Sequence, residues 1–389
     1  MKFLLEILDA LFGKLLSLFI IRVSRLFKIK YTSRNLWGSL GHTLAEMDYF
    51  LRLKKSGQIN KNIKIVFLSN ENKMSKVVYK MFQENFIFLI TSPYLEFFLK
   101  KRVLWPNQDL CLDIGLNSLS RNSSGNITQR EMLDSNISYY KMISSNENFK
   151  PFKNFKIDQD LINFLGFDLH KTKYIVVQIK QGIANATATK TDPLTYIKTI
   201  KYFKDKNYKV IFAGKKENFP GEFENLEIIN YNNFKYQSIK TDIDLVSKAS
   251  LVICGASGFG LLPSLLDIPC VWANSWQVGF PVSGRYVVQL PLKFIDKKTN
   301  KFVSYDKIIN HHLEIDKYDF KSFHLYGLIP NNDEEIFEAA LEAISLKKKY
   351  SDFSDNYKNF IKKCDYLPIR YASSRISERF ILNNMSLFK

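Results

Sequence analysis

Apolar residues in the second half of the chain gather in short continuous runs, separated by polar segments with helical spacing. The runs are 174–179 (YIVVQI), 209–213 (KVIFA), 226–229 (LEII), 251–254 (LVIC) and 269–273 (PCVWA). Runs of this kind, without polar alternation, are typical of parallel strands buried on both faces. Helical spacing at 193–204 and 243–248 supplies connections between them. The pattern therefore predicts an α/β fold with a Rossmann-like sheet in this half.

The first half repeats the pattern less regularly. It predicts strands at 35–37, 63–68 and 86–90, and helices at 42–55 and 73–83. Between residues 117 and 148, 14 of 32 residues are Asn or Ser, which predicts a loop-rich connector or lid. A further helix is predicted at 333–349, and 357–383 is expected to run back across the first domain. The predicted organisation is an amphipathic membrane-surface helix (1–32), a Rossmann-like acceptor domain (33–165), a Rossmann-like donor domain (166–350) and a returning helical segment (351–389).

The first 21 residues are strongly apolar, but polar and small residues form one helical stripe. This stripe consists of Lys2, Glu6, Asp9, Gly13 and Ser17. Charged residues interrupt the run that a spanning helix needs, and no signal-peptide cleavage site follows. A basic run comes next: Arg22, Arg25, Lys28, Lys30 and Arg34. We expect an amphipathic helix on an anionic membrane surface; docking on the protein's own core is the main alternative, ahead of true spanning.

The charge of the 389-residue chain is strongly positive. Lys and Arg number 56 against 38 Asp and Glu, a formal net charge of +18. This balance favours anionic partners, namely phosphorylated substrates, an acidic membrane or nucleic acid, although a solvated basic surface explains it equally well. The cysteines Cys111, Cys254, Cys270 and Cys364 have no zinc or disulfide spacing. We interpret them as small buried side chains in a reducing cytoplasm.

A glycine loop is the sharpest candidate site. Cys254-Gly255-Ala256-Ser257-Gly258-Phe259-Gly260 lies between a predicted strand and a predicted helix. Gly255, Gly258 and Gly260 allow backbone N–H groups to approach a phosphate, the helix N-terminus adds positive charge, and Ser257 can donate a hydrogen bond. The loop is neither a G-x-G-x-x-G fingerprint nor a P-loop. The alternative is that the glycines serve only tight strand-to-helix packing.

A second Gly-rich turn, Trp37-Gly38-Ser39-Leu40-Gly41-His42, leads into a predicted helix. The positive helix end keeps His42 neutral, which suits a general base, while Gly38 and Gly41 would form an acceptor-side loop. Glu46 lies one turn further on and would orient His42 or act as the base itself. Asp48 is a weaker candidate because it lies on another face. The alternative is an ordinary first-turn His.

Several residues follow predicted strands, where α/β proteins bind ligands. Lys180 and Lys215 could each neutralise a phosphate, or be plain surface, and Asn274 is a further donor-binding candidate. Trp276 could stack on a base or sugar ring, or belong to the core or rim. His311, His312 and His324 form no metal pattern, and no Asp-x-Asp motif occurs, so we expect no metal.

These motifs together resemble a known family. The stretch 244–260, continued through Pro263 and the 267–271 turn to Asn274, resembles the donor domain of GT-B glycosyltransferases, including their heptosyltransferase and fucosyltransferase-like branches. With 41–46 and 48–52, the chain from about Arg34 is similar to uncharacterised bacterial glycosyltransferases linked to surface polysaccharides. Two differences stand out: Gln178-Ile179-Lys180 replaces His-x-Arg, and no acidic residue follows the glycines.

The resemblance implies two Rossmann-like domains facing a cleft and a metal-independent transferase without a cofactor. A nucleotide-sugar donor would react with a lipid-linked or surface-polysaccharide acceptor on the inner face of a cell membrane. Two alternative hypotheses are a nucleotide-sugar epimerase of the same architecture and a non-catalytic membrane-bound nucleotide-sugar-binding protein. A nucleic-acid partner is not expected, because no recognition module accompanies the charge.

Overall fold

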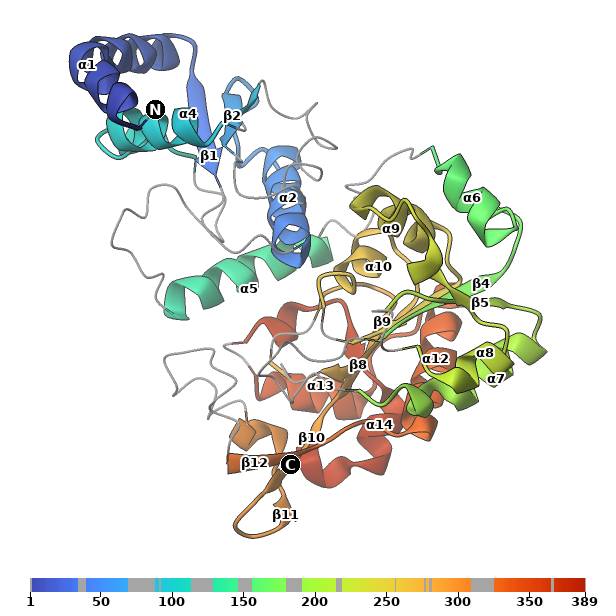
Figure 1. The fold of residues 1–389 in the computed structure, drawn as a ribbon. Helices are drawn as coiled ribbons and strands as arrows, with labels where there is room; N and C mark the ends of the chain where they lie inside the picture. Colours follow the sequence, from blue (N-terminus) through green and yellow to red (C-terminus); the bar gives the residue numbers. More distant parts are fainter. Residues whose placement is uncertain are drawn as a thin grey trace. The chain divides into compact units, whose positions relative to one another are not determined.

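The structure is a computed structural model, and it divides into two compact units, Met1–Asn136 and Ile137–Lys389 (Figure 1). The described residues are 2–33, 40–68, 88–90, 92–112, 129–145, 156–179, 191–214, 219–255, 257–275, 278–279, 282–308, 325–364 and 367–388. Each unit contains a parallel sheet. The predicted α/β class and the N-terminal helix are therefore confirmed, while a cleft between the two domains stays a prediction.

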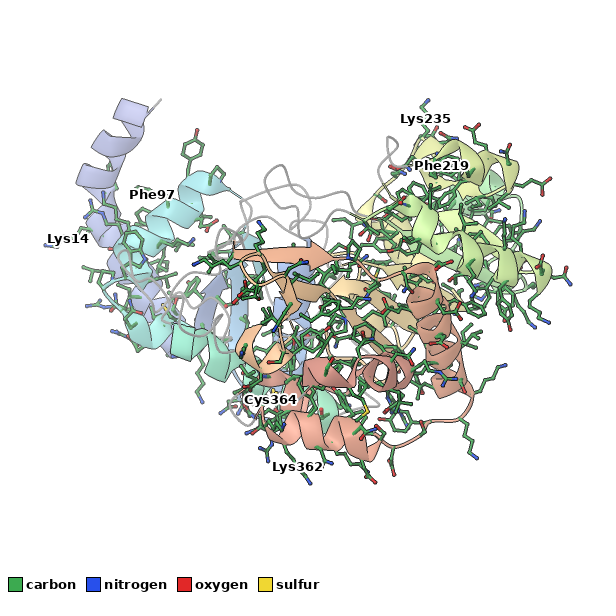
Figure 2. All side chains as sticks on the ribbon, turned by 90° about the horizontal axis from the view of Figure 1, so that it is seen from below. Lys14, Phe97, Phe219, Lys235, Lys362 and Cys364 are labelled. Carbon is green, nitrogen blue, oxygen red and sulfur yellow. The ribbon has the colours of Figure 1, made fainter. Side chains whose placement is uncertain are left out.

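The first unit is built on a small parallel sheet in the order β1-β2-β3. Its elements are α1 (Lys2–Leu26), β1 (Ile29–Ser33), α2 (Leu40–Lys55), β2 (Lys64–Leu68), β3 (Phe88–Ile90), α4 (Pro93–Phe98), the π-helix η2 (Leu99–Leu104) and the 3-10 helix η3 (Gln108–Leu110). Lys14 on α1 and Phe97 on α4 lie at the rim of this unit (Figure 2). None of the described helices has both the length and the apolar character needed to cross a membrane.

The N-terminal region differs from the predicted division at residue 32. The segment 29–33 is a strand that pairs with β2, so part of the predicted basic run belongs to the sheet. Its pattern alternates apolar and polar residues, and the basic neighbours concealed this from the sequence analysis. The predicted strand at 35–37 and the predicted helix at 73–83 lie outside the described residues.

The predicted connector at 117–148 is wrong for residues 129–145, which form the helix α5 (Gln129–Ser145). Tyr139, Tyr140 and Met142 are buried on this helix. The count of Asn and Ser residues concealed apolar residues with helical spacing, and burial of those residues stabilises the helix. The remaining residues of the predicted connector lie outside the described part.

The second unit is built on a seven-stranded sheet in the order β13-β9-β8-β7-β4-β5-β6, with every neighbouring pair parallel. Its strands are β4 (Tyr174–Gln178), β5 (Lys209–Phe212), β6 (Ile229–Asn230), β7 (Leu251–Cys254), β8 (Cys270–Ser275), β9 (Val287–Pro291) and β13 (Arg375–Ile376). From β4 the chain moves outward to β5 and β6, then returns to β7 on the other side of β4. The strand order therefore reverses between β4 and β7, as in doubly wound folds.

Helices and a small second sheet complete this unit. The helices are α6 (Gln159–Leu165), η5 (Pro193–Tyr196), α7 (Ile197–Asp205), α8 (Gly221–Asn225), η7 (Tyr231–Asn233), α9 (Ile239–Ser247), α10 (Leu261–Leu265), α12 (Asp333–Lys348), α13 (Asp355–Lys362), η9 (Pro368–Tyr371), α14 (Glu378–Asn383) and η10 (Met385–Phe388). The strands β10 (Lys293–Asp296), β11 (Lys301–Phe302) and β12 (Tyr326–Ile329) form an antiparallel sheet.

The C-terminal segment is part of the second unit, whereas the sequence analysis expected it to return to the first domain. Its strand β13 pairs with β9 at the edge of the large sheet. The side chain of Glu342 on α12 accepts a hydrogen bond from the Glu378 backbone N–H at 3.1 Å. The fully buried Arg375 donates to the backbone carbonyls of Ser351 and Asp352. The segment thus completes the sheet and packs on α12.

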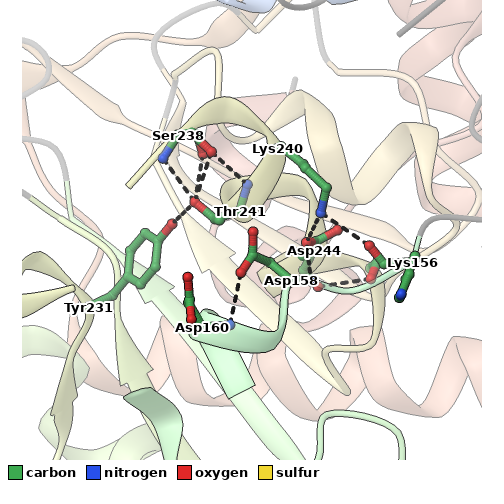
Figure 3. Close-up of polar contacts among 9 residues, drawn as sticks. Lys156, Asp158, Asp160, Tyr231, Ser238, Lys240, Thr241 and Asp244 are labelled. Atoms are coloured by element: carbon green, nitrogen blue, oxygen red, sulfur yellow. Dashed lines mark hydrogen bonds and ion pairs between the residues drawn. The ribbon is translucent and has the colours of Figure 1, made fainter. Parts of the chain in front are cut away.

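A buried carboxylate on α9 acts as a clamp that holds the segment entering α6 (Figure 3). Asp244 is fully buried and accepts hydrogen bonds from the Asp158 N–H at 2.9 Å and from Lys240 Nζ at 2.6 Å. A reciprocal capping box between Ser238 and Thr241 begins the same helix. Because α9 leads directly into β7, this clamp fixes the entering chain relative to the strand that precedes the glycine loop.

Candidate functional site

The glycine loop lies at the point where the strand order of the large sheet reverses. The last residue of β4, Gln178, pairs in register with the last residue of β7, Cys254. Both strands are parallel, so both end at the same edge of the sheet, and the loop 255–260 follows directly. In open α/β sheets, ligands bind outside the carboxyl ends of the strands at this reversal. The loop therefore occupies the place where a ligand is expected.

Ser257 holds the loop in shape. Its Oγ donates to Gln178 Oε1 at 3.1 Å. The Gly260 N–H is shared between the Ser257 carbonyl oxygen at 3.1 Å and Ser257 Oγ at 3.3 Å. The predicted donation from Ser257 to a phosphate therefore competes with a bond inside the protein. From the sequence, Gln178 stands out only as a departure from a family pattern, and no local pattern indicates this contact.

The free donors of the loop are backbone groups. The N–H groups of Leu261 and Leu262 donate to the carbonyl oxygens of Gly258 and Phe259. The N–H groups of Gly258 and Phe259 donate to no acceptor among the described residues. Both residues are half-buried, so these two N–H groups are suited to an anionic ligand.

The predicted contribution of the helix dipole is small. The helix α10 that follows the loop has only five residues. The macrodipole is a sum over aligned peptide units, and the first N–H groups of this helix already have partners in the loop. Any anion binding here therefore relies on the loop's own amides.

Two glycines of the loop differ in whether packing requires glycine at their position. A Cβ atom on Gly260 would lie 2.9 Å from both Cys254 Sγ and Trp272 Cζ3, so this position requires Gly for packing. A Cβ atom on Gly255 would meet only the Ala273 carbonyl oxygen, at 3.8 Å, among the described atoms. Neighbour packing therefore explains Gly260 and leaves Gly255 unexplained.

Two thiols lie directly below the loop. Cys254 and Cys270 are fully buried, and their Sγ atoms are 3.7 Å apart. Burial and the neighbouring thiol raise the pKa of Cys270 well above its ordinary value. Burial likewise raises the pKa of Cys111 to about 11 and that of Cys364 to about 12. Thiols in this state are protonated and weakly reactive. Cys254, Cys270 and Cys364 are buried as predicted, whereas Cys111 is only partly buried.

Asn274, the penultimate residue of β8, lies in the left-handed region, with φ of +53°. It is 3% exposed, and its backbone N–H and side-chain oxygen make reciprocal hydrogen bonds of 2.7 Å with Asn331. Its Nδ2 donates to Thr191 Oγ1 at 3.3 Å. Asn tolerates this backbone conformation better than most residues. Asn274 therefore shapes the rim of the site, and direct contact with a donor stays a prediction.

The predicted base lies in the first unit. Gly41 is buried in the first turn of α2, and the backbones of His42 and Glu46 lie one turn apart on that helix. The side chains of these two residues, and Gly38, Lys180, Lys215 and Trp276, lie outside the described part. Asp48 is fully buried and forms an ion pair of 2.8 Å with Arg52, which gives it a structural role. Among the described side chains, no cluster of His, Cys, Asp and Glu is placed to hold a metal ion.

Comparisons with known proteins give distant similarities in structure. No protein-family model matches the sequence, and no curated protein matches it significantly. A glycosyl transferase family 9 protein from Veillonella parvula is 13% identical with a TM-score of 0.48, covering 82% of this chain and 98% of that one. The ADP-heptose lipopolysaccharide heptosyltransferase II of E. coli is 10% identical with a TM-score of 0.41, covering 82% and 99%.

A structure of another class is similar to a comparable extent. A putative UDP-N-acetylglucosamine 2-epimerase from Listeria monocytogenes is 12% identical with a TM-score of 0.35, covering 84% of this chain and 98% of that one. With TM-scores below 0.5, none of these similarities identifies a ligand or a reaction for this chain.

Proposed function

We propose that the protein is a glycosyltransferase that moves a sugar from a nucleotide-sugar donor to a lipid-linked or surface-polysaccharide acceptor. The observation that carries the proposal is the glycine loop at the strand reversal, where the Gly258 and Phe259 N–H groups have no acceptor among the described residues. Backbone amides in such a position can hold a diphosphate without a metal ion. The resemblance of 244–274 to GT-B donor domains supports the same assignment.

The proposed reaction assigns different steps to the two units. The donor diphosphate binds the loop of the second unit, and Lys180 or Lys215 offsets the charge of the leaving group. His42 or Glu46 of the first unit takes the proton from the acceptor hydroxyl. The acceptor oxygen forms a bond to the anomeric carbon while the bond to the diphosphate breaks, which releases the nucleoside diphosphate. The acceptor is reached from the cytoplasmic face of a membrane, where the basic chain attaches peripherally.

Nucleotide binding to the loop is the first point to test. Thermal unfolding of the full chain would be followed with UDP, GDP, ADP, CMP and their sugars, including ADP-heptose, the sugar nucleotide named for the similar E. coli enzyme. A ligand at 100 times its Kd stabilises the native state by about 2.7 kcal/mol. In a unit of this size, that raises the Tm by roughly 5 to 10 °C.

The loop assignment has a matched pair of variants. Gly258→Asp places a carboxylate against the phosphate and should abolish the nucleotide-induced shift. Gly221→Asp begins the helix α8, where a Cβ meets no described atom within 4 Å, and should leave the shift intact. An unchanged shift in Gly258→Asp would rule out the loop as the nucleotide site.

The rival functions are separated by the products. An epimerase would interconvert the donor sugar without an acceptor, which proton NMR of the donor alone would detect. A binding protein would give the thermal shift and no turnover with any acceptor. Transfer that requires both donor and acceptor supports the proposal.

A further inference from the structure

The packed side of the helix α1 consists of small and polar residues together with Ile20 and Ile21, whereas most of its large apolar side chains from residue 12 onward face solvent. From residue 12 onward, where the side chains are described, Gly13, Ser17 and Ser24 are buried. The exposed large apolar residues of this segment are Phe12, Leu15, Leu16, Leu18, Phe19, Leu26 and Phe27. A helix on the surface of a soluble domain places these two classes the other way round.

Specific contacts fix this orientation. Ser24 Oγ and the Tyr31 hydroxyl lie 2.9 Å apart in a buried hydrogen bond. Ile20 and Ile21 pack against the core cluster of Tyr31, Val66, Leu68, Leu99, Val103, Leu104 and Leu110. At the end of the helix, Arg25 makes two hydrogen bonds to the Asp109 carboxylate. The helix therefore cannot turn its apolar face inward without losing these contacts.

The helix α4 also exposes large apolar side chains and buries a polar one. Glu96 is 2% exposed and pairs with Lys100 at 2.5 Å, whereas Phe97 is 61% exposed. Tyr94 and Leu95 are exposed as well. The chain continues directly into η2, whose buried Leu99, Val103 and Leu104 belong to the core cluster against which α1 packs. The helices α1 and α4 therefore both contact η2 and lie near each other (Figures 1 and 2).

From residue 12 onward, the charged residues of α1, α4 and their flanking segments are mostly basic, whereas Glu6 and Asp9 lie earlier on α1. Residues 12–33 and 92–112 contain eight Lys and Arg against two acids, Glu96 and Asp109. Both acids are already paired, with Lys100 and Arg25 respectively. Lys101 lies over the Phe97 ring at 5.6 Å, so a cation and an exposed aromatic ring occupy the same patch. The patch combines apolar insertion with attraction to negative charge.

We propose that the exposed apolar residues of α1 and α4, with Trp105 just after η2, form one lipid-binding surface that inserts into an anionic bilayer. This α1/α4 surface deepens the peripheral attachment included in the proposed function, but it does not depend on the sugar-transfer reaction. A second copy of the chain fits less well, because two such surfaces would bring like charges together. Trp and Tyr at the margin suit the headgroup region.

The test measures flotation of the full chain with vesicles of phosphatidylglycerol and phosphatidylcholine, without nucleotide. Phe19→Glu and Phe97→Glu should each weaken binding at least tenfold, equivalent to about 1.4 kcal/mol, and the double variant should not bind detectably. The matched control is Phe302→Glu, because Phe302 is 56% exposed on β11 in the second unit. It should bind as the parent protein does.

Two further experiments test the role of charge in vesicle binding and the alternative that the surface binds a second copy of the chain. Lys14→Glu with Lys101→Glu should reduce binding to phosphatidylglycerol vesicles, and pure phosphatidylcholine should bind the parent weakly. Equal binding by Phe97→Glu and the parent would overturn the proposal, as would loss of binding by Phe302→Glu. A dimer of the parent that Phe19→Glu dissociates, with no vesicle binding by either, would instead assign the surface to a second copy.

Folding is checked in the same variants by circular dichroism and by nucleotide-induced thermal shifts. A variant that loses vesicle binding but keeps its nucleotide shift supports the surface independently of the reaction. Deleting the residues before Tyr31 is a poorer test, because it removes Ile20, Ile21 and Ser24 from the core of the first unit.

Discussion

The large sheet of the second unit and the helices α1 and α4 of the first unit place apolar side chains in opposite ways. On β4 and β7, every Val and Ile side chain is fully buried. On α1, Leu15 is 70% and Phe19 is 64% exposed, and a serine is buried on the same helix. Both regions are rich in apolar residues. Apolar content therefore marks a core in one unit and an interaction surface in the other, and only the polar residues beside it distinguish the two.

The largest effect is expected from introducing the same charge into the two regions. Ile253→Asp buries a carboxylate at the centre of the large sheet and should cost about 4 kcal/mol or more, enough to prevent folding. Leu15→Asp should change the free energy of unfolding by about 0.5 kcal/mol or less. Urea unfolding and soluble yield measure both. Comparable losses in the two variants would mean that the outer face of α1 is a packing face.

The second prediction concerns the proposed base in the first unit, which should affect turnover but not donor binding in the second unit. If His42 is the base, His42→Ala should lower turnover roughly a hundredfold or more and leave donor binding nearly unchanged. If Glu46 is the base, Glu46→Gln should be the more damaging change. Turnover with the donor identified by thermal shift is the measurement. Full activity in both variants would exclude the start of α2 from the reaction.

The third prediction compares two glycines of the loop, one that packing requires and one with space beside it. Gly260→Ala forces a Cβ against Cys254 and Trp272 and should destabilise the protein by about 1 to 3 kcal/mol. Gly255→Ala has room and should keep the Tm within a few degrees, while weakening the nucleotide-induced shift. Thermal unfolding with and without nucleotide tests both variants. An equal loss of Tm in the two would assign both glycines to packing.

The smallest effect concerns buried carboxylates, which the two units also treat differently. Glu96 in the first unit forms an ion pair with Lys100, whereas Glu342 in the second unit accepts a hydrogen bond from the Glu378 backbone N–H. One carboxylate oxygen of each residue is buried without a hydrogen-bond partner among the described residues. Burial raises the pKa of Glu342 from its ordinary 4.5 to about 7. The native state therefore binds more protons than the unfolded state between these values, and stability falls as pH rises through this window.

Replacing the carboxyl group isolates this contribution. Glu342→Gln should match the parent below about pH 4, where both forms are neutral, and exceed its stability by about 1 to 2 kcal/mol above pH 7. Urea unfolding across this pH range is the measurement, with Glu96→Gln as the comparison, which should lose stability because Lys100 loses its partner. Identical pH profiles for Glu342→Gln and the parent would contradict the assignment.

Much of the second unit could be predicted from the sequence because its strands are buried on both faces. Continuous apolar runs located β4, β5, β7 and β8, and the glycines located the loop between β7 and α10. The 3-10 and π segments and the exposed face of α4 could not be predicted, because Tyr94-Leu95-Glu96-Phe97 does not state which side packs. Glu96 is buried because Lys100, four residues later, pairs with it and because residues distant in the sequence form the core beside it.

The position of the candidate site could be predicted from the sequence, whereas its hydrogen bonds could not. The loop position follows from the strand–glycine–helix pattern, but the Ser257–Gln178 hydrogen bond joins residues 79 positions apart, and only the sheet register brings them together. Asn274 was predicted as a ligand contact from its place after a strand. Its engagement by Asn331 depends on a segment that precedes α12, which no local pattern indicates.

The edge position of β13 has a consequence for how the protein is made. The two residues of this strand lie close to the C-terminus, yet they cover the side of β9 that would otherwise expose unpaired backbone groups. During synthesis, β9 emerges long before β13, so the large sheet retains an open edge until β13 has emerged. A prematurely terminated chain lacking this strand would keep that edge permanently and be prone to aggregate through it.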